Sequence, residues 1–331
     1  MRFDSPEKIL RFARGFMESR ILLSGAELNI FTVLSEEPLT AKEVSSRIGA
    51  DLRALIILLD ALAAMGLLIK KGETYRCDAA LAPFLSKGHP RSVLPMVLHA
   101  AHLWHRWSRL TNVVQGGTAE SGSTARPSRG TDEMQAFIGA MHVVALPLAR
   151  EIVAAVNPGP SKALLDVGGA SGTYTIAFLQ ASPRMKATLF DRPEVVEMAR
   201  ERLGEAGMLD RTVLVAGNFY RDEFPEGHDL AFVSAIIHQN SPEQNLDLYG
   251  KVFRSLNSGG RIVIRDHVME PDRVHPKDGA FFAVNMLMGT EGGGTYTFEQ
   301  IKTGLSQAGF KEVRLLQKGK HMDALVEAFK S

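Results

Sequence analysis

From Ala163 onward, the chain alternates short apolar segments with stretches of helical spacing. Short apolar strands separated by helices are typical of a doubly wound, mainly parallel α/β sheet. Such a sheet binds its ligand at the carboxyl ends of its strands. Functional residues are therefore expected where strands end. The predicted strands are ALLDVGG, KATLFD, TVLVAGN, LAFVSAII, RIVIRDHV, EVRLLQ and MDALVEAF.

A run of small residues follows the first of these strands. Asp166 ends the strand, and residues 168–172, GGASG, lead into the next helix. Small residues let a ligand approach the main chain, and a helix N-terminus attracts negative charge. The spacing differs from the G-x-G-x-x-G of dinucleotide sites, so the turn offers no cradle for a pyrophosphate.

A second acid, Asp191, ends the next strand, about 20 residues beyond the turn. A carboxylate at this place accepts hydrogen bonds from ribose hydroxyls. The predicted ligand therefore has a ribose but lacks phosphates. An amino-acid-bearing nucleoside fits this description, and S-adenosylmethionine is the leading candidate.

Composition excludes several classes of function. With 331 residues, two domains are expected, and a net charge of +1 does not suggest a nucleic-acid partner. The single cysteine, Cys77, excludes intrachain disulfides and cysteine-built metal sites. The N-terminus lacks the apolar core of a signal peptide, and the most apolar window, residues 52–69, contains Arg53 and Asp60. That window is interpreted as a buried helix rather than a membrane span, which predicts a cytoplasmic protein.

Residues 39–78 predict a winged-helix unit. Thr40 and Glu43 form a capping box for a first helix, Gly49 ends it, and Asp51 caps a second helix, which closes at Gly66. A strand, a turn at Lys71–Gly72 and another strand follow.

The second helix of this unit, residues 51–66, does not suit DNA recognition. It offers Leu, Ile, Ala and Met, and Arg53 is its only basic residue, whereas a recognition helix presents several polar side chains to the major groove. We expect it to be buried in a core or a dimer interface. Residues 117–132 are interpreted as a surface loop, and helical spacing resumes over residues 133–156.

The motifs, taken in order, resemble those of the plant-type, caffeate-like family of class I S-adenosylmethionine-dependent O-methyltransferases. The family includes acetylserotonin methyltransferases and bacterial members that act on antibiotics and pigments. The motifs are LLDVGGASG, FDRPEVV, VAGNFYRDEFPEGHDLAFVSAIIHQNSPEQN, SGGRIVIRDHV and AGF, and together with the winged-helix unit they cover nearly the whole chain.

The resemblance implies an architecture: a doubly wound, Rossmann-like methyltransferase sheet with an N-terminal, all-helical winged-helix dimerisation domain. It implies domains at residues 1–105 and 106–331, a homodimer, a small-molecule substrate, and S-adenosyl-L-methionine as cofactor. No metal, nucleic-acid or membrane partner is expected.

The resemblance also assigns cofactor-binding residues. Ala170 stands at the middle glycine of the family's cofactor loop. Asn218 stands where the family usually has an Asp facing the adenine amino group, and its amide oxygen can accept the same hydrogen bond. Phe219 matches the residue that packs on the adenine ring. The full cofactor set is Asp166, Gly168, Gly169, Gly172, Asp191, Arg192, Asn218, Phe219 and Ser234.

His238 matches the family's catalytic histidine. A phenol has a pKa near 10, so a base beside it is useful at neutral pH, and a general base contributes about 10²–10⁴-fold. The sequence departs from the family around this residue. Gln239 and Asn240 follow it instead of Asp-Trp, Asp266 stands for the first orienting acid, and the uncharged Thr295 aligns with the second.

Each of these assignments has a structural alternative. His238 could be a buried, hydrogen-bonded histidine, and Asp266 could cap a turn. His267 is a rival base, although strand alternation points it to the opposite face from Asp266. Asn285 and Met286 are candidates for the substrate pocket, in a Met- and Phe-rich segment that could equally be core.

Four further polar residues are interpreted structurally. Thr297 is expected to cap the following helix with Gln300. His99, His102 and His105 recur at helical spacing without a carboxylate, which favours packing over a metal site.

Two other functions stay open at this point. The same scaffold could methylate carbon or nitrogen by alignment alone, with His238 less critical. A winged-helix regulator could sense S-adenosylmethionine without catalysis.

Overall fold

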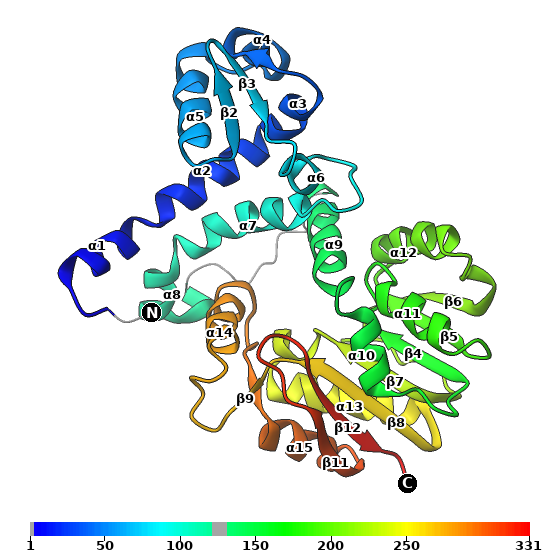
Figure 1. Cartoon of the computed structure of the whole chain (residues 1–331). Helices are drawn as coiled ribbons and strands as arrows, with labels where there is room; N and C mark the ends of the chain where they lie inside the picture. Colours follow the sequence, from blue (N-terminus) through cyan, green and yellow to red (C-terminus); the bar gives the residue numbers. More distant parts are fainter. Residues whose placement is uncertain (1–2, 121–130) are drawn as a thin grey trace. The chain divides into compact units, whose positions relative to one another are not determined.

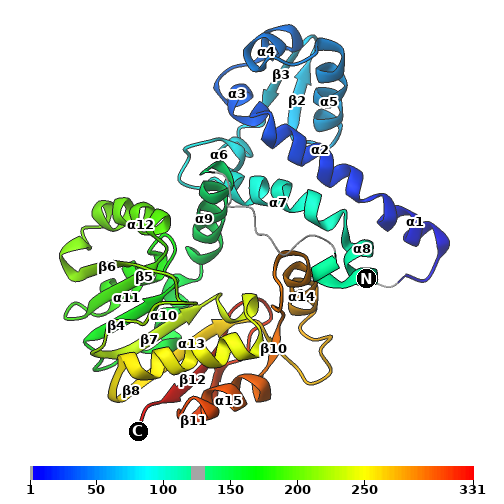
Figure 2. The ribbon, with the colours of Figure 1, turned by 180° about the vertical axis from the view of Figure 1, so that it is seen from behind.

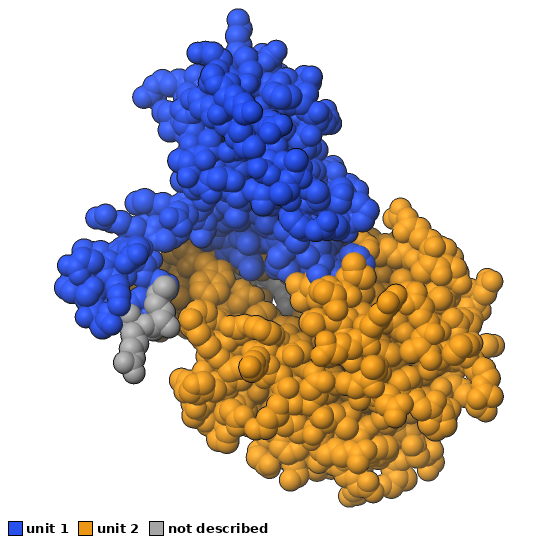
Figure 3. Space-filling model, in the orientation of Figure 1, with its two compact units in different colours: residues 1–105, 130–143 blue, residues 106–129, 144–331 orange. Residues whose placement is uncertain are grey.

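The computed structural model describes residues 3–120 and 131–331, without the side chains of residues 119–120, 131–133 and 135–136. The chain divides into two compact units (Figure 3). Met1–His105 and Gly130–Val143 form the first unit, and Arg106–Arg129 and Val144–Ser331 form the second.

The first unit is helical apart from a small antiparallel sheet of order β1-β3-β2 (Figure 1). Its strands are β1 (Leu39–Thr40), β2 (Leu68–Lys71) and β3 (Thr74–Cys77). Its helices are α1 (Pro6–Arg14), α2 (Phe16–Glu27), α3 (Ile30–Glu36), α4 (Ala41–Ile48), α5 (Leu52–Ala64), α6 (Ala82–Leu85), most of α7 (Leu94–Trp107) and most of α9 (Thr131–Ala145).

The predicted helix signals are confirmed. Thr40 and Glu43 form a capping box, and Gly49 ends α4 with φ of 67°. The Asp51 carboxylate accepts a hydrogen bond from the Ala54 amide at 2.8 Å. The predicted turn was one residue too early, because Lys71 still pairs with Thr74 and the turn lies at Gly72–Glu73.

Residues 51–66 were expected to be buried in a core or a dimer interface, and within one chain one face of α5 is buried. Leu55, Leu59 and Leu62 are buried in the core of the unit, whereas Ile56 and Ile57 are exposed. Helix α1 buries none of its residues. The first unit therefore exposes apolar helix surface.

The second unit contains a seven-stranded sheet of order β11-β12-β8-β7-β4-β5-β6. The five strands from β8 to β6 in this order are parallel, and β12 is antiparallel to both its neighbours, so the predicted doubly wound, mainly parallel sheet is confirmed. The strands are β4 (Ala163–Val167), β5 (Lys186–Asp191), β6 (Thr212–Ala216), β7 (His228–Ser234), β8 (Leu256–Asp266), β11 (Lys311–Gln317) and β12 (Ala324–Phe329).

Helices cover both faces of this sheet (Figures 1 and 2), and strand alternation divides its core into two layers. Leu164 and Phe232 pack with α10 (Ala149–Val156) and α11 (Thr173–Ala181) on one face. Leu165 and Val233 pack with α13 (Pro242–Ser255) and α15 (Phe298–Gln307) on the other. Further elements are α12 (Pro193–Glu205), α14 (Lys277–Gly289), the 3-10 turns η1 (Leu209–Arg211) and η2 (Ile237–Gln239), and the parallel pair β9 (Val268–Met269) and β10 (Tyr296–Thr297).

The loop predicted over residues 117–132 differs from the structure at both ends. Helix α8 (Leu110–Glu120) extends into it across a kink at Gly117, and α9 begins at Thr131. The remainder, residues 121–130, lies outside the described residues. The helical stretch predicted over residues 133–156 is two helices, α9 and α10, because the chain turns at residues 146–148, around Pro147.

Within the described ranges, no single helix is long and apolar enough to cross a membrane. The bent pair Phe137–Ala145 and Ala149–Val156 reaches that length and composition only when taken together.

Candidate active site

The glycine-rich turn joins β4 to α11 at the carboxyl edge of the sheet. Gly168 and Gly172 have φ of 66° and 75°, and even Ala170 has φ of 48°. A Cβ atom on Gly169 would lie 2.6 Å from Leu189 Cγ, so packing within the protein also requires glycine there. Residues 168–170 remain partly exposed, which leaves their main chain open to a ligand.

Asp191 connects the end of β5 to this turn. Its Oδ2 accepts a hydrogen bond from the Ala170 amide at 2.9 Å, and its Oδ1 accepts one from the Arg192 amide at 2.7 Å. Burial raises the pKa of the Asp191 carboxyl, and these two amides oppose the rise. The predicted ribose acid therefore also fixes the turn.

Asp166 lies beneath the turn, with only 1% of its surface exposed. Its Oδ2 accepts a hydrogen bond from the Thr175 hydroxyl at 2.6 Å. Burial raises the pKa of Asp166 to about 6, against this hydrogen bond, and the nearby Asp191 contributes to the rise. Asp166 thus anchors the first turn of α11 through the Thr175 hydroxyl.

The residues predicted to hold the adenine lie after β6. Asn218 Oδ1 accepts a hydrogen bond from the Tyr220 amide at 3.0 Å, which leaves one lone pair of that oxygen for a ligand. Phe219 is half-buried against the main core, and the buried Lys251 donates to its carbonyl oxygen at 2.9 Å. Arg192 precedes α12, is exposed, and pairs with Glu194 at 3.2 Å.

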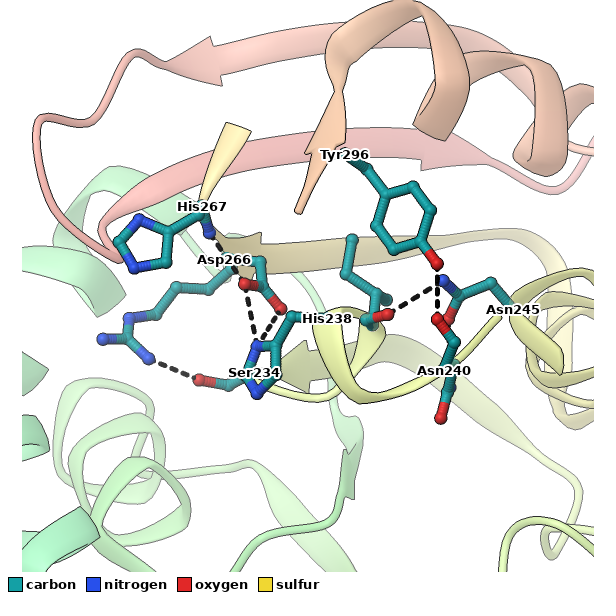
Figure 4. Close-up of polar contacts among 9 residues, drawn as sticks. Ser234, His238, Asn240, Asn245, Asp266, His267 and Tyr296 are labelled. Carbon is teal, nitrogen blue, oxygen red and sulfur yellow. Dashed lines mark hydrogen bonds and ion pairs between the residues drawn. The ribbon is translucent and has the colours of Figure 1, made fainter. Parts of the chain in front are cut away.

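His238 and Asp266 meet on the α13 face of the sheet (Figure 4). His238 lies in η2, just beyond β7, and Asp266 ends β8. His238 Nδ1 lies 3.0 and 2.9 Å from the two Asp266 oxygens, and the His267 amide donates to Asp266 Oδ1 at 2.7 Å. Burial by itself raises the pKa of the Asp266 carboxyl, but the charge and hydrogen bond of His238 bring it below its usual value.

One carboxylate alone orients His238 within the described part of the chain. Thr295, the counterpart of the second acid, is buried but forms no hydrogen bond with His238. The Thr295 carbonyl instead accepts a hydrogen bond from Arg273 at 2.9 Å.

Helix α14 supplies the apolar surroundings of His238. The ring of Phe282 lies 4.7 Å from the His238 ring and 5.1 Å from the His267 ring, centroid to centroid. In Figure 4 the His267 ring points away from the Asp266 carboxylate, as strand alternation predicts. Met286 is buried, and Asn285 Oδ1 accepts a hydrogen bond from Trp107 Nε1 at 3.0 Å.

A hydrogen-bond network that the sequence did not predict connects the adenine-side loop to the His238 turn. Figure 4 shows the part of it around Asn240, Asn245 and Tyr296. Tyr220 donates to Asn240 Oδ1 at 2.7 Å, Asn240 donates to Asn245 Oδ1 at 3.0 Å, and the Tyr296 hydroxyl donates to the Asn240 carbonyl. Asn245 in turn donates to the Ile237 carbonyl at 2.9 Å. In the sequence, the polar segment HQNSPEQN after an apolar strand was the one feature that could have indicated this network.

The capping role predicted for Thr297 is confirmed. Thr297 and Gln300 form a capping box at α15. Among the described residues, no His, Cys, Asp and Glu side chains cluster as metal ligands, and the ring of His99 lies 5.4 Å from that of Phe137.

Comparison with known families identifies the family of this chain. Residues 107–311 match the O-methyltransferase domain, which covers more than half of the chain. This chain belongs to the O-methyltransferase family. Residues 10–84 of this O-methyltransferase match the O-methyltransferase dimerisation domain, and the resemblance drawn from the motifs is thereby confirmed.

Two bacterial relatives match nearly the full length of this O-methyltransferase. The 3-hydroxy-5-methyl-1-naphthoate 3-O-methyltransferase of Streptomyces sahachiroi is 30% identical over 319 residues, covering 94% of this chain and 91% of the relative. The tetracenomycin polyketide synthesis 8-O-methyl transferase TcmO of Streptomyces glaucescens is 31% identical over 314 residues, covering 93% and 92%.

A solved structure has the same fold. The structure of PigF with SAH superimposes with a TM-score of 0.89, over 98% of this chain and all of that chain, at 23% sequence identity.

Proposed function

We propose that this O-methyltransferase transfers the methyl group of S-adenosylmethionine to a hydroxyl of a small, largely apolar aromatic molecule, with His238 as the general base. The observation that carries the proposal is the pairing of His238 Nδ1 with the buried Asp266 carboxylate at 2.9 Å. The family of the chain supports the reaction class.

The pairing sets the tautomer of His238. Because Asp266 accepts at Nδ1, the neutral ring carries its proton there, and Nε2 is the nitrogen that can accept a proton. An acceptor hydroxyl beside Nε2 would lose its proton as the new O–CH₃ bond forms. Phe282 gives this position an apolar wall that suits an aromatic ring, and the buried Met286 lies on the same helix.

The turn and the strand ends fit an adenosyl ligand. The partly exposed main chain of residues 168–170, the carboxylate of Asp191 and the ring of Phe219 can hold an amino-acid-bearing nucleoside. When bound, S-adenosylmethionine supplies an electrophilic methyl group. The chain's own residues orient both reactants and remove the acceptor's proton.

The class of acceptor is supported by the two relatives, whose names describe a naphthoate and a tetracenomycin polyketide. We therefore expect a phenolic hydroxyl on a fused or substituted aromatic system.

We further propose a cytoplasmic homodimer in which residues 1–105, with the winged-helix unit, form the dimerisation domain and residues 106–331 bind the cofactor. The match to a dimerisation domain and the unburied helix α1 support the homodimer.

The test is incubation with labelled S-adenosylmethionine and a panel of phenols, quinols and amines. Transfer to a phenol is expected, and His238→Ala should lower kcat by about 10²–10⁴-fold while leaving cofactor affinity unchanged. A His238→Ala variant with full phenol methylation would remove the base assignment. Transfer to amines alone would favour N-methylation. A gel shift with genomic fragments and no transfer at all would favour a regulator.

A further inference from the structure

Arg265 is a buried cation in the interior of strand β8. Only 3% of its surface is exposed, and its side chain lies on the α11 face of the sheet, opposite to Asp266. Its Nη1 donates a hydrogen bond to Ser234 Oγ at 3.0 Å, and its guanidinium carbon lies 5.2 Å from the centroid of the Tyr174 ring.

Within the described residues, no carboxylate lies at ion-pair distance from this guanidinium, and Arg265 Nε is buried without a hydrogen-bond partner. Arg261, four residues earlier on the same strand, shows the contrast. It pairs with Glu327 and donates to the carbonyls of Val156 and Asn157. A buried charge without a counter-ion is costly, so an anion that reached the guanidinium of Arg265 would be stabilised there.

A second polar group near Arg265 also lacks a partner. The hydroxyl of Tyr174 is buried and forms no hydrogen bond in the described part of the chain. Tyr174 lies in the first turn of α11, directly after the glycine-rich turn, and Ser234 ends β7. Two donors without acceptors therefore lie together beside the turn predicted to hold the cofactor.

We propose that Arg265, with Ser234 and Tyr174, forms a carboxylate-binding subsite for the amino-acid end of S-adenosylmethionine. The planar guanidinium can donate two parallel hydrogen bonds to a carboxylate, and the tyrosine hydroxyl can donate a third. The inference rests on the proposed function, because it takes the cofactor from it. It adds the side chains that select a ligand with an α-carboxylate.

The test compares two ligands that differ only in this group. Dissociation constants of S-adenosylhomocysteine and of its decarboxylated analogue are measured by isothermal titration calorimetry for the full chain. The intact protein should bind S-adenosylhomocysteine about 10–100-fold more tightly than the analogue. Arg265→Met should reduce this ratio to near one by weakening S-adenosylhomocysteine alone, and Arg265→Lys should restore part of it.

Arg254→Met is the matched control, because it removes an exposed guanidinium from the same unit and should leave the ratio unchanged. Tyr174→Phe, which removes only the hydroxyl, should reduce the ratio by about 3–10-fold and keeps the inference testable if Arg265→Met does not fold. Circular dichroism checks folding of each variant.

The outcomes separate the two proposals. An intact protein that binds neither ligand would contradict the proposed function. Binding with a ratio that Arg265→Met and Tyr174→Phe leave unchanged would overturn the subsite alone. A third result, in which Arg265→Met weakens 3-hydroxy-2-naphthoate relative to 2-naphthol but spares the cofactor ratio, would assign the guanidinium to an acceptor carboxylate and overturn the cofactor assignment.

Discussion

Asp166 and Asp266 both lie buried at the ends of parallel strands, yet their pKa values move in opposite directions. Asp166 has the Thr175 hydroxyl as its side-chain partner, and burial raises its pKa to about 6. Asp266 faces the imidazole of His238, which lowers its pKa against the effect of burial. The hydrogen-bond partner therefore decides the direction of the pKa shift: Asp166, which holds the turn, has a neutral partner, and Asp266, which orients the general base, has an imidazole.

Replacing Asp166 with Asn should change how stability depends on pH. The pKa of Asp166 is raised from 3.8 to about 6, so the cost of its charge is absent below pH 3.8 and complete above pH 6. The cost amounts to about 3 kcal/mol at neutral pH. Asp166→Asn should thus gain stability relative to the unmodified protein as the pH rises from 4 to 7. Urea unfolding across this range measures the difference, and a pH-independent difference would contradict the assignment.

Replacing Asp266 with Asn should separate catalysis from binding. The amide keeps the size of the side chain but loses the charge that favours a protonated imidazole, so kcat should fall about 10²-fold or more. The dissociation constant of S-adenosylhomocysteine should stay the same, because Asp266 lies on the opposite face of the sheet from Ser234 and Arg265. Equal losses in kcat and cofactor affinity would show that the variant disturbs the whole carboxyl edge of the sheet.

The family resemblance predicted Asp266 as the orienting acid of His238, and the structure brings the two side chains together. Asp191 and Ala170 were each predicted as cofactor residues, but the hydrogen bond between them was not predicted. Arg265 was missed, although an arginine within an apolar strand is itself a signal of buried charge. Its partner Tyr174 lies 91 positions earlier in the chain, and no local pattern predicts that contact. The hydrogen bond between Trp107 and Asn285 likewise joins residues far apart in the sequence, so no local pattern predicts it.

Among the elements, η2 depends on the network around Asn240. Asn240 is fully buried and bonds to Tyr220, Asn245 and Tyr296. The network joins the loop after β6 to the segment that carries His238. Hydrogen bonds therefore link the predicted adenine-binding loop to the predicted general base.

Asn240→Ala should leave buried hydrogen-bonding groups without partners and lower the free energy of unfolding by about 1–3 kcal/mol. It should also weaken S-adenosylhomocysteine, since Tyr220 loses its anchor beside Phe219. Asn257→Ala, which removes an exposed asparagine bonded to Asp229, is the control and should change neither quantity appreciably. Urea unfolding and calorimetry give both measurements, and unaltered cofactor affinity in Asn240→Ala would argue against the connection.

Capping boxes, glycine ends and apolar runs predicted most elements because these signals are local. The breaks within helical stretches were less predictable. Helical spacing continues across residues 146–148 although the chain turns there, and α8 continues past its kink at Gly117. Which face of α5 is covered depends on tertiary packing, and helical spacing alone does not determine it.

On the scale of the whole molecule, the helices of the first unit expose large apolar side chains that a stable monomer would be expected to bury. Phe12 on α1 is 61% exposed and Ile57 on α5 is 57% exposed. A short helix without buried residues is marginal in water, so α1 requires a covering surface. A second copy of the chain is the cover expected from the dimerisation domain.

Sedimentation at micromolar concentration should therefore show a dimer. Phe12→Glu and Ile57→Glu should each shift the equilibrium toward monomer, because an interface would bury an unpaired charge. Val213→Glu changes an apolar residue that is 61% exposed in the second unit, and it should leave the dimer intact. Equal dissociation in all three variants would point to general instability instead.

The position of β12 has a consequence for biosynthesis. This strand is translated after the other six of its sheet, yet it lies between β11 and β8 with hydrogen bonds on both sides. While residues 324–329 are still inside the ribosomal exit tunnel, the position between β11 and β8 is empty. The edges of both strands are then available for pairing with neighbouring chains. Chaperone occupancy of stalled nascent chains should consequently drop only after residues 324–329 have emerged.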